Sequence, residues 1–174
     1  MSLQTMGERM DLEREKRFLA AHAASHDRIY RYFRRRTDGP ATAEDLCAEV
    51  FRIAWEKSGH GDDLSALVLF GMAKNVLRNH ERSLSRSAGL IGAMRLERAP
   101  EAQGEGSAIR ESIDHLAPQE REVLLLTYWD NLTAVEVSKL LNTSATAVRM
   151  RLHRARKELS RIMQEQTVSE GAAE

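Results

Sequence analysis

Residues 143–159 read TSATAVRMRLHRARKEL, and this stretch decides the fold of the C-terminal part of the chain. Apolar residues recur along it at alternating spacings of four and three, which is the period of one face of an α-helix. They are Val148, Leu152, Ala155, Leu159 and the following Ile162. We therefore expect a helix whose apolar face packs into a core and whose first backbone N–H groups are capped by Ser144.

The opposite face of this helix is strongly basic. Six basic residues against Glu158 alone give six minus one, a local charge of about +5. A solvated helix usually mixes both signs of charge to avoid self-repulsion, so this helix is expected to meet a polyanion. A basic surface without a ligand is the plainer interpretation of the charge alone. The basic residues are Arg149, Arg151, Arg154, Arg156, Lys157 and Arg161.

A shorter helix is predicted directly upstream, beginning at about Ala134. Thr133 is a good N-cap, and Glu136 three residues later completes the pattern of a capping box. The helix is expected to end at Asn142, because Asn tolerates the left-handed conformation common at helix ends. Two short helices joined this tightly, the second of them basic, predict a helix-turn-helix with its recognition helix second. Any helical hairpin could share the pattern, but the basic face favours DNA binding.

The chain from Ile113 to Arg156 resembles the fourth, promoter-binding region of bacterial sigma factors, and more narrowly that of the extracytoplasmic-function (ECF) group. Two positions depart from the family pattern: Ala147 stands where Thr is usual, and Asn142 stands where Gly is usual. The motifs that carry the resemblance are Arg121-Glu122, Leu132-Thr133, Glu136-Val137, Val148, Arg151-Leu152 and Arg154-Ala155-Arg156.

The resemblance implies that the basic helix enters the major groove of the minus-35 promoter element. Guanine, where one occurs, is expected to pair with Arg149 or Arg154. The residues expected to read base edges are Arg149, Met150, His153 and Arg154. Those expected to hold phosphates are Ser144, Thr146, Arg151 and Arg156.

The composition bounds the remaining possibilities. The 174 residues suffice for one ordinary domain or two small ones, and a formal net charge of zero hides acidic and basic blocks that can bind different partners. One cysteine, Cys47, excludes an internal disulfide and a multi-cysteine metal site, and it fits a reducing cytoplasm. No run approaches the roughly 18 apolar residues of a membrane span, so we expect a cytoplasmic protein.

The residues up to Gly39 are predicted to form one amphipathic helical stretch. Its end carries the cluster Arg34 to Arg36, which either compensates the helix dipole or contacts phosphate. His22 and His26 stand four residues apart and could share a metal ion, but no third ligand lies nearby. We expect surface positions for both histidines, and neither a metal ion nor a cofactor.

The next helix is predicted to begin with Thr42 as its cap and to show an acidic face. The segment is similar to the ECF pattern Ala-Glu-Asp-Leu-x-Gln-Glu-Val-Phe, which docks on the clamp helices of RNA polymerase, with Ala48 in place of the Gln. A solvated acidic face would explain the charges equally well. The polymerase-binding residues that the resemblance implies are Glu44, Asp45, Glu49 and Phe51.

A long helix is predicted over about 64–83, capped by Asp63. It resembles the family segment that faces the minus-10 element, although Val68 stands at the usual Trp position. In the family the preceding loop receives a flipped base, so the resemblance implies that His60 contacts this base. A solvent-exposed loop without a ligand is the plainer interpretation. The residues implied to hold opened promoter DNA are Lys74, Asn75, Arg78 and Arg82.

Glycine, serine and proline punctuate residues 85–111, which predicts a flexible linker. The expected fold is all-α, with a region-2-like helical domain over 1–84 and a helix-turn-helix domain over 112–163. A polar tail over 164–174 is expected to fray.

The function that these features imply is that of a sigma factor, which binds core RNA polymerase and directs it to promoters, with a possible anti-sigma factor as a further partner. The alternative is a stand-alone helix-turn-helix regulator that binds operators without polymerase. An enzyme is disfavoured because the sequence has no glycine-rich phosphate loop, no His-Glu-x-x-His and no nucleophile elbow.

Overall fold

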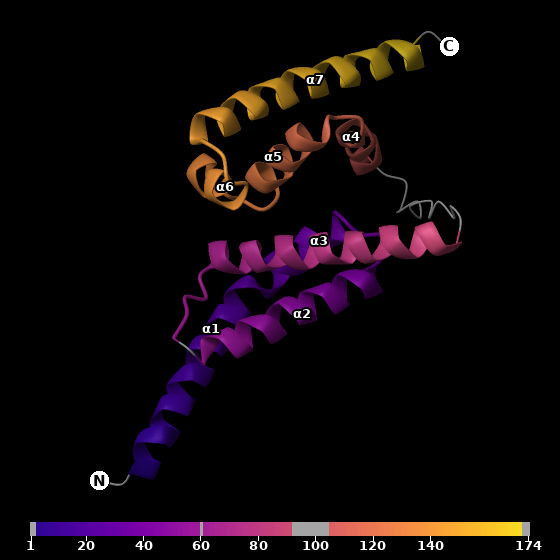
Figure 1. Ribbon diagram of the computed structural model, residues 1–174. Helices are drawn as coiled ribbons and strands as arrows, with labels where there is room; N and C mark the ends of the chain where they lie inside the picture. The colour runs from indigo at the N-terminus through magenta and orange to yellow at the C-terminus, as the bar shows by residue number, and fades with distance from the viewer. Residues whose placement is uncertain (1–2, 60, 92–104, 172–174) are drawn as a thin grey trace. The chain divides into compact units, whose positions relative to one another are not determined.

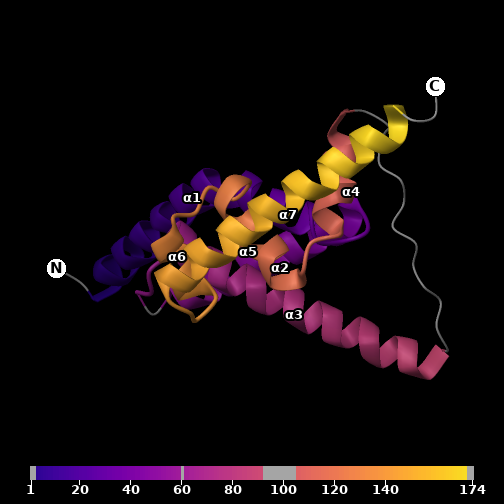
Figure 2. The same cartoon turned by 90° about the horizontal axis from the view of Figure 1, so that it is seen from above.

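The structure is a computed structural model that describes residues 3–59, 61–91 and 105–171, and the regular elements in these ranges are all α-helices (Figures 1 and 2). The all-α fold expected from the sequence is confirmed. The chain divides into two compact units, Met1–Ala99 and Pro100–Glu174.

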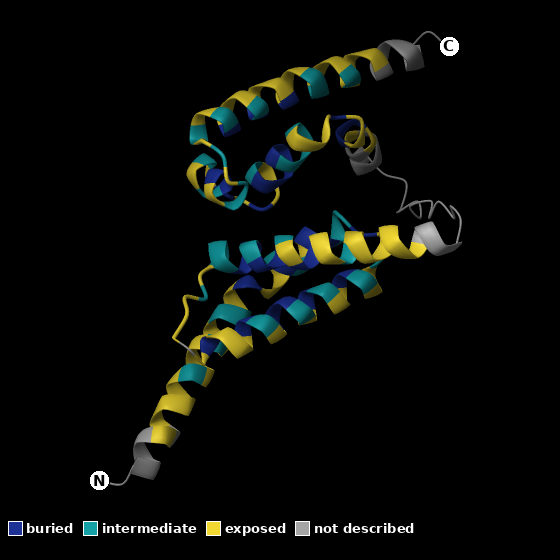
Figure 3. Ribbon diagram, viewed as in Figure 1, coloured by how far each residue is buried: buried dark blue, intermediate teal, exposed yellow. Residues whose placement is uncertain are grey.

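The first unit consists of α1 (Leu3–Arg34), α2 (Pro40–Ser58) and α3 (Ala66–Ile91), which all contact one another. Their buried sides face inward and the exposed sides face outward (Figure 3). The core of this unit contains Ile29, Tyr32, Phe33, Val50, Leu69 and Phe70.

Two helix starts in this unit differ from the sequence prediction. α2 begins at Pro40 rather than after Thr42, with Gly39 as its N-cap, because Pro needs no hydrogen-bond partner at the first helical position. α3 begins at Ala66 rather than at about residue 64. The Asp63 carboxylate instead accepts hydrogen bonds from the Ser65 backbone N–H at 2.9 Å and the Ser65 hydroxyl at 2.7 Å, which forms a turn ahead of the helix.

An aromatic cluster joins α1 to α2. Phe51 is only 6% exposed, and its ring lies 4.4 Å from the His22 ring and 6.4 Å from the Phe18 ring, centroid to centroid. Phe18 also meets Trp55 edge-on at 5.1 Å. One sequence prediction is therefore corrected: His22 is a half-buried packing residue rather than a surface residue. Phe51, which the resemblance implies as a polymerase-binding residue, lies in the core between α1 and α2.

Arg14 holds α1 against the C-terminal end of α2. Its Nε donates to the Ser58 hydroxyl at 2.9 Å, and its Nη2 donates to the Trp55 carbonyl at 2.7 Å. The guanidinium also lies 4.1 Å from the centroid of the Trp55 ring. A cation at this position is favourable because the last carbonyl groups of a helix carry partial negative charge.

The second unit contains α4 (Glu105–Asp114), α5 (Pro118–Tyr128), α6 (Ala134–Leu140) and α7 (Ala145–Gly171). Helices α4, α5 and α6 all contact α7. The apolar row predicted for the basic helix is confirmed, since Val148 and Ala155 are fully buried, Leu152 is 8% exposed and Leu159 is half-buried.

The predicted linker and tail are shorter in the structure than in the sequence prediction. Helix α3 continues to Ile91, α4 begins at Glu105, and α7 continues to Gly171, so the predicted linker is helical at both ends and most of the predicted tail is helical. The middle of the linker, 92–104, lies outside the described residues. Serine does not end α3 because the Ser85 and Ser87 hydroxyls donate to the carbonyls of Glu81 and Ser83 within the helix.

His22 gives the first unit a pH-dependent stability. Burial, and then the neighbouring His26, lower the pKa of His22 below its usual value. Below about pH 6.5 the unfolded chain therefore binds a proton that folded His22 resists, and the free energy of unfolding falls as the pH drops. We expect His22→Leu to weaken this loss between about pH 7 and about pH 5.5, as measured by urea unfolding across the pH range.

The control is His153→Gln, which removes an exposed histidine from α7 in the second unit and should leave the unfolding of the first unit unchanged. An equal loss of stability in the wild-type and His22→Leu proteins over this pH range would contradict the assignment.

Candidate nucleic-acid interface

The helix-turn-helix is held first by a capping box at the start of α6. The Glu136 backbone N–H donates to the Thr133 hydroxyl at 3.3 Å, and the Thr133 backbone N–H donates to the Glu136 carboxylate at 2.7 Å. This confirms the predicted start of the helix at Ala134. A cap of this kind stabilises a helix by about 1 kcal/mol.

The turn between α6 and α7 closes on Asn142, whose φ of 50° lies in the left-handed region. The Thr143 N–H donates to the Ser138 carbonyl at 2.9 Å, and the Asn142 N–H donates to the Lys139 carbonyl at 3.4 Å. This pair of bonds is the Schellman motif, which satisfies carbonyl groups at the end of α6. The left-handed residue predicted at Asn142 is confirmed.

Ser144 caps α7, as predicted: its hydroxyl accepts a hydrogen bond from the Ala147 backbone N–H at 3.0 Å. Because the row of Val148, Leu152 and Ala155 is buried against the neighbouring helices, the opposite face of α7 is turned outward. The predicted minus-35 residues exposed on α7 and its cap are Ser144, Thr146, Arg149, Met150, His153, Arg154 and Arg156, while Arg151 is half-buried.

The charge on α7 is unevenly neutralised. Arg161, near its middle, donates to the carboxylates of Glu158 and Glu165, both at 2.5 Å. In the part of the chain that the structure describes, no carboxylate pairs with Arg149, Arg151 or Arg154. The uncompensated positive charge is therefore concentrated in the first turns of α7, where a recognition helix presents its side chains to bases.

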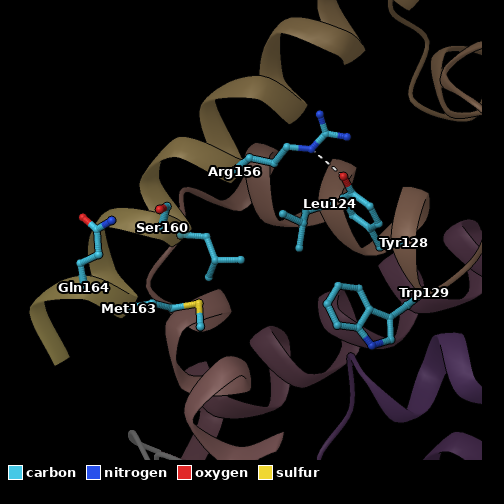
Figure 4. Close-up of a pocket in the computed structure, with 8 residues that line it drawn as sticks. Leu124, Tyr128, Trp129, Arg156, Ser160, Met163 and Gln164 are labelled. Atoms are coloured by element: carbon cyan, nitrogen blue, oxygen red, sulfur yellow. Dashed lines mark hydrogen bonds between the residues drawn. The ribbon is translucent and has the colours of Figure 1, made fainter. Parts of the chain in front are cut away.

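Arg156 differs from the other predicted contacts. Its Nε donates to the Tyr128 hydroxyl at 2.5 Å, and its guanidinium carbon lies 5.3 Å from the centre of the Tyr128 ring (Figure 4). It also lines a mostly apolar cavity of about 610 Å³ between α5 and α7, together with Leu124, Trp129, Leu159 and Met163. The structure thus holds Arg156 on the flank of α7 toward α5, away from the outward face that carries Met150 and His153.

The acidic face of α2 is smaller than its composition indicates. Glu44 and Asp45 are exposed, but Arg52 pairs with Glu49 at 2.7 Å and also with Glu56. The hydrogen bond from Arg52 is the main cause that lowers the pKa of Glu49. Of the predicted polymerase contacts, Glu44 and Asp45 are the exposed carboxylates that make no such pair among the described residues.

On α3 the predicted contacts form part of a basic row. Asn75, Arg78 and Arg82 are exposed, with Arg78 Nη2 donating to Asn75 Oδ1 at 3.4 Å, and Lys74 is half-buried. Arg86, which the sequence interpretation placed in the linker, continues the row because α3 runs on to Ile91. The spacing of four residues from Arg78 to Arg82 to Arg86 was the signal that could have identified it.

His60, which the resemblance implies as a minus-10 contact, lies outside the described residues. Among the described residues no three or more His, Cys, Asp or Glu side chains gather in a way that could hold a metal ion.

Burial raises the pKa of the Cys47 thiol to about 11, so Cys47 stays protonated at neutral pH.

Comparison with known proteins agrees with the geometry of α5 to α7. Residues 107–159 match the sequence family described as Sigma-70, region 4. The chain is 29% identical over 150 residues to the ECF RNA polymerase sigma factor BldN of Streptomyces coelicolor, covering 79% of this chain and 56% of BldN. It is 30% identical over 130 residues to the probable RNA polymerase sigma factor RfaY of Xanthomonas campestris pv. campestris, covering 67% of this chain and 32% of RfaY. The chain therefore matches about half the length of BldN and about a third of RfaY.

Two solved structures share the fold. The sigma factor RpoE of Bartonella quintana, solved with the anti-sigma factor NepR, aligns with a TM-score of 0.64 at 17% identity and covers 86% of this chain and 96% of its own. CnrH, solved with the cytosolic domain of CnrY, aligns with a TM-score of 0.62 at 20% identity and covers 85% of this chain and 88% of its own. No helix among the described residues is both long enough and apolar enough to cross a membrane. Residues 107–159 therefore belong to the Sigma-70, region 4 family, and over most of its length the chain is similar to RNA polymerase sigma factors, among them the ECF sigma factor BldN.

Proposed function

We propose that this chain binds core RNA polymerase and directs it to specific promoters, where α7 reads the minus-35 element and α3 holds the opened minus-10 element. The observation that carries the proposal is the outward face of α7, whose first turns present arginines without carboxylate partners among the described residues. This face lies within the 107–159 stretch that matches Sigma-70, region 4. Such a function belongs in the cytoplasm, with the polymerase.

The proposed mechanism joins two weak DNA sites on one polymerase. Arg149 and Arg154 lie where a recognition helix reaches base edges, so they would supply direct readout, with guanine as the natural partner of each. Arg151 would hold the DNA backbone. Each site alone would bind modestly, and attachment to one enzyme raises the effective concentration of the second site once the first is bound.

For α3 the proposal assigns a different task. Asn75 and Arg78, which are already hydrogen-bonded to each other, would contact bases and phosphates of the separated strand, and Arg82 would extend the phosphate contacts. Contacts with phosphate and unstacked bases offset part of the free energy needed to unpair the duplex, and the polymerase supplies the rest.

On α2 we propose that Glu44 and Asp45 contribute to the polymerase-docking surface, since both carboxylates are exposed. Glu49 is already paired with Arg52, so its loss would leave Arg52 with Glu56 as its partner as well as remove a carboxylate. Phe51 would act indirectly, by packing α2 onto α1.

We further propose that an anti-sigma protein covers these surfaces until a signal arrives. RpoE of Bartonella quintana, which shares the fold, was solved with such a protein. Co-purification of a protein that blocks the association with core polymerase would support this regulation. Constitutive promoter-directed activity of the chain in its own cells would count against it.

The competing function is a helix-turn-helix regulator that acts without polymerase. Run-off transcription with purified core polymerase and a candidate promoter decides between the two. We expect promoter-dependent transcripts only when the chain and core polymerase are both present. Tight binding to a palindromic site in the absence of core polymerase, without any transcript, would favour the regulator instead.

The role of α3 leads to a prediction about promoter opening. We expect the combined change Asn75→Ala and Arg78→Ala to reduce the permanganate reactivity of unpaired minus-10 thymines, because the separated strand loses its contacts. Binding of the same protein to core polymerase should stay unchanged. Ser83→Ala, an exposed position elsewhere around α3, serves as the control. Unchanged opening by the double variant would refute the assignment.

The role of α7 leads to a prediction that separates readout from backbone contact. Arg154→Ala should weaken binding by ~1–3 kcal/mol and relax the preference at one base pair, because a base contact is lost. Arg151→Ala should weaken binding to all sequences evenly and flatten the salt dependence by about one unit of slope, because a phosphate contact is lost. The measurement is holoenzyme binding to a panel of minus-35 sequences at several salt concentrations. Equal effects of both changes on every sequence would contradict the division.

A further inference from the structure

Met150 lies at the centre of the outward face of α7. A helix turns by about 100° per residue, so Met150 points almost directly away from the buried row of Val148, Leu152 and Ala155. Its side chain is 53% exposed. When this face approaches a duplex, Met150 is thus among the first side chains to reach the floor of the groove.

The surroundings of Met150 make an apolar side chain unexpected there. Of its four neighbours one turn away on the helix, Thr146, His153 and Arg154 are exposed and polar, and Ala147 is half-buried. Single exposed apolar residues are common on protein surfaces, so exposure alone carries no argument. The position of Met150 is informative, because a thioether at the centre of a basic face can neither hold a phosphate nor donate a hydrogen bond to a base edge.

The major groove offers one apolar feature, the C5-methyl group of thymine. We propose that Met150 contacts the C5-methyl group of a thymine in the minus-35 element and so selects an A·T pair at that position. The flexible, unbranched methionine side chain can follow the methyl group as the helix settles in the groove. This inference rests on the proposed promoter recognition and adds the chemical group that is read.

The experiment removes only that methyl group. The minus-35 element is first selected from a random duplex library by the full chain with core polymerase. Each thymine of the selected element is then replaced in turn by deoxyuridine, which pairs in the same way but lacks the C5-methyl group. Holoenzyme affinity for each fragment is measured with the wild-type chain, Met150→Ala and Met150→Leu.

We expect deoxyuridine at one position to weaken wild-type binding by about fourfold, because the burial of one methyl group is lost. Met150→Ala should bind the thymine and deoxyuridine fragments equally at that position, whereas Met150→Leu should keep a preference for thymine. Met10→Ala, which changes an exposed methionine on α1, is the matched control and should behave as the wild type.

Three results would overturn the inference: a selected element without an A·T pair, equal wild-type binding to every deoxyuridine fragment, or an unchanged thymine preference in Met150→Ala. These results leave promoter recognition itself standing. Failure of the holoenzyme to select any sequence would instead overturn the proposed function. The proposed contact between Met150 and thymine would then be overturned as well.

Discussion

The burial of one row of α7 against its neighbouring helices is the constraint on which the candidate interface depends. Val148 and Ala155 are fully buried and Leu152 nearly so. A buried Val or Leu side chain stabilises the fold by about 1.5–3 kcal/mol, so rotating α7 about its axis would be costly. Because a helix is rigid, fixing the inward row also fixes which residues face outward. A contact inside the core thus decides which side chains form the candidate interface.

Local hydrogen bonds set where α7 begins. The capping box at Thr133, the Schellman motif at Asn142 and the cap at Ser144 follow one another within about a dozen residues. They satisfy backbone groups that would otherwise be left unpaired at three successive helix ends. The short α6 gains stability from these caps that its length alone cannot supply. The turn is consequently well defined, and it fixes where the outward face of α7 begins.

Charge is separated between faces although the net charge of the chain is zero. Ion pairs within the protein refine this separation. Arg52 neutralises part of the acidic face of α2, and Glu158 and Glu165 neutralise Arg161 on α7. What remains for partners is an exposed acidic pair on α2, a basic row on α3 and the arginines in the first turns of α7. Counting charges along the sequence overestimates these surfaces, because it cannot subtract the pairs.

The sequence by itself determined the all-α fold, the caps and start of α6 and α7, and the buried row of α7. These features depend on residues within about one or two helical turns of one another, so their pattern is complete in a short window. The sequence placed His22 at the surface, did not identify the partners of Phe51 and Arg156, and ended α3 too early. Only the tertiary structure decided the first three, because each depends on a partner that no local window contains. The aromatic cluster needs α1 beside α2, the bond from Arg156 needs Tyr128 of α5, and α3 continues through serines whose hydroxyls bond to its own backbone.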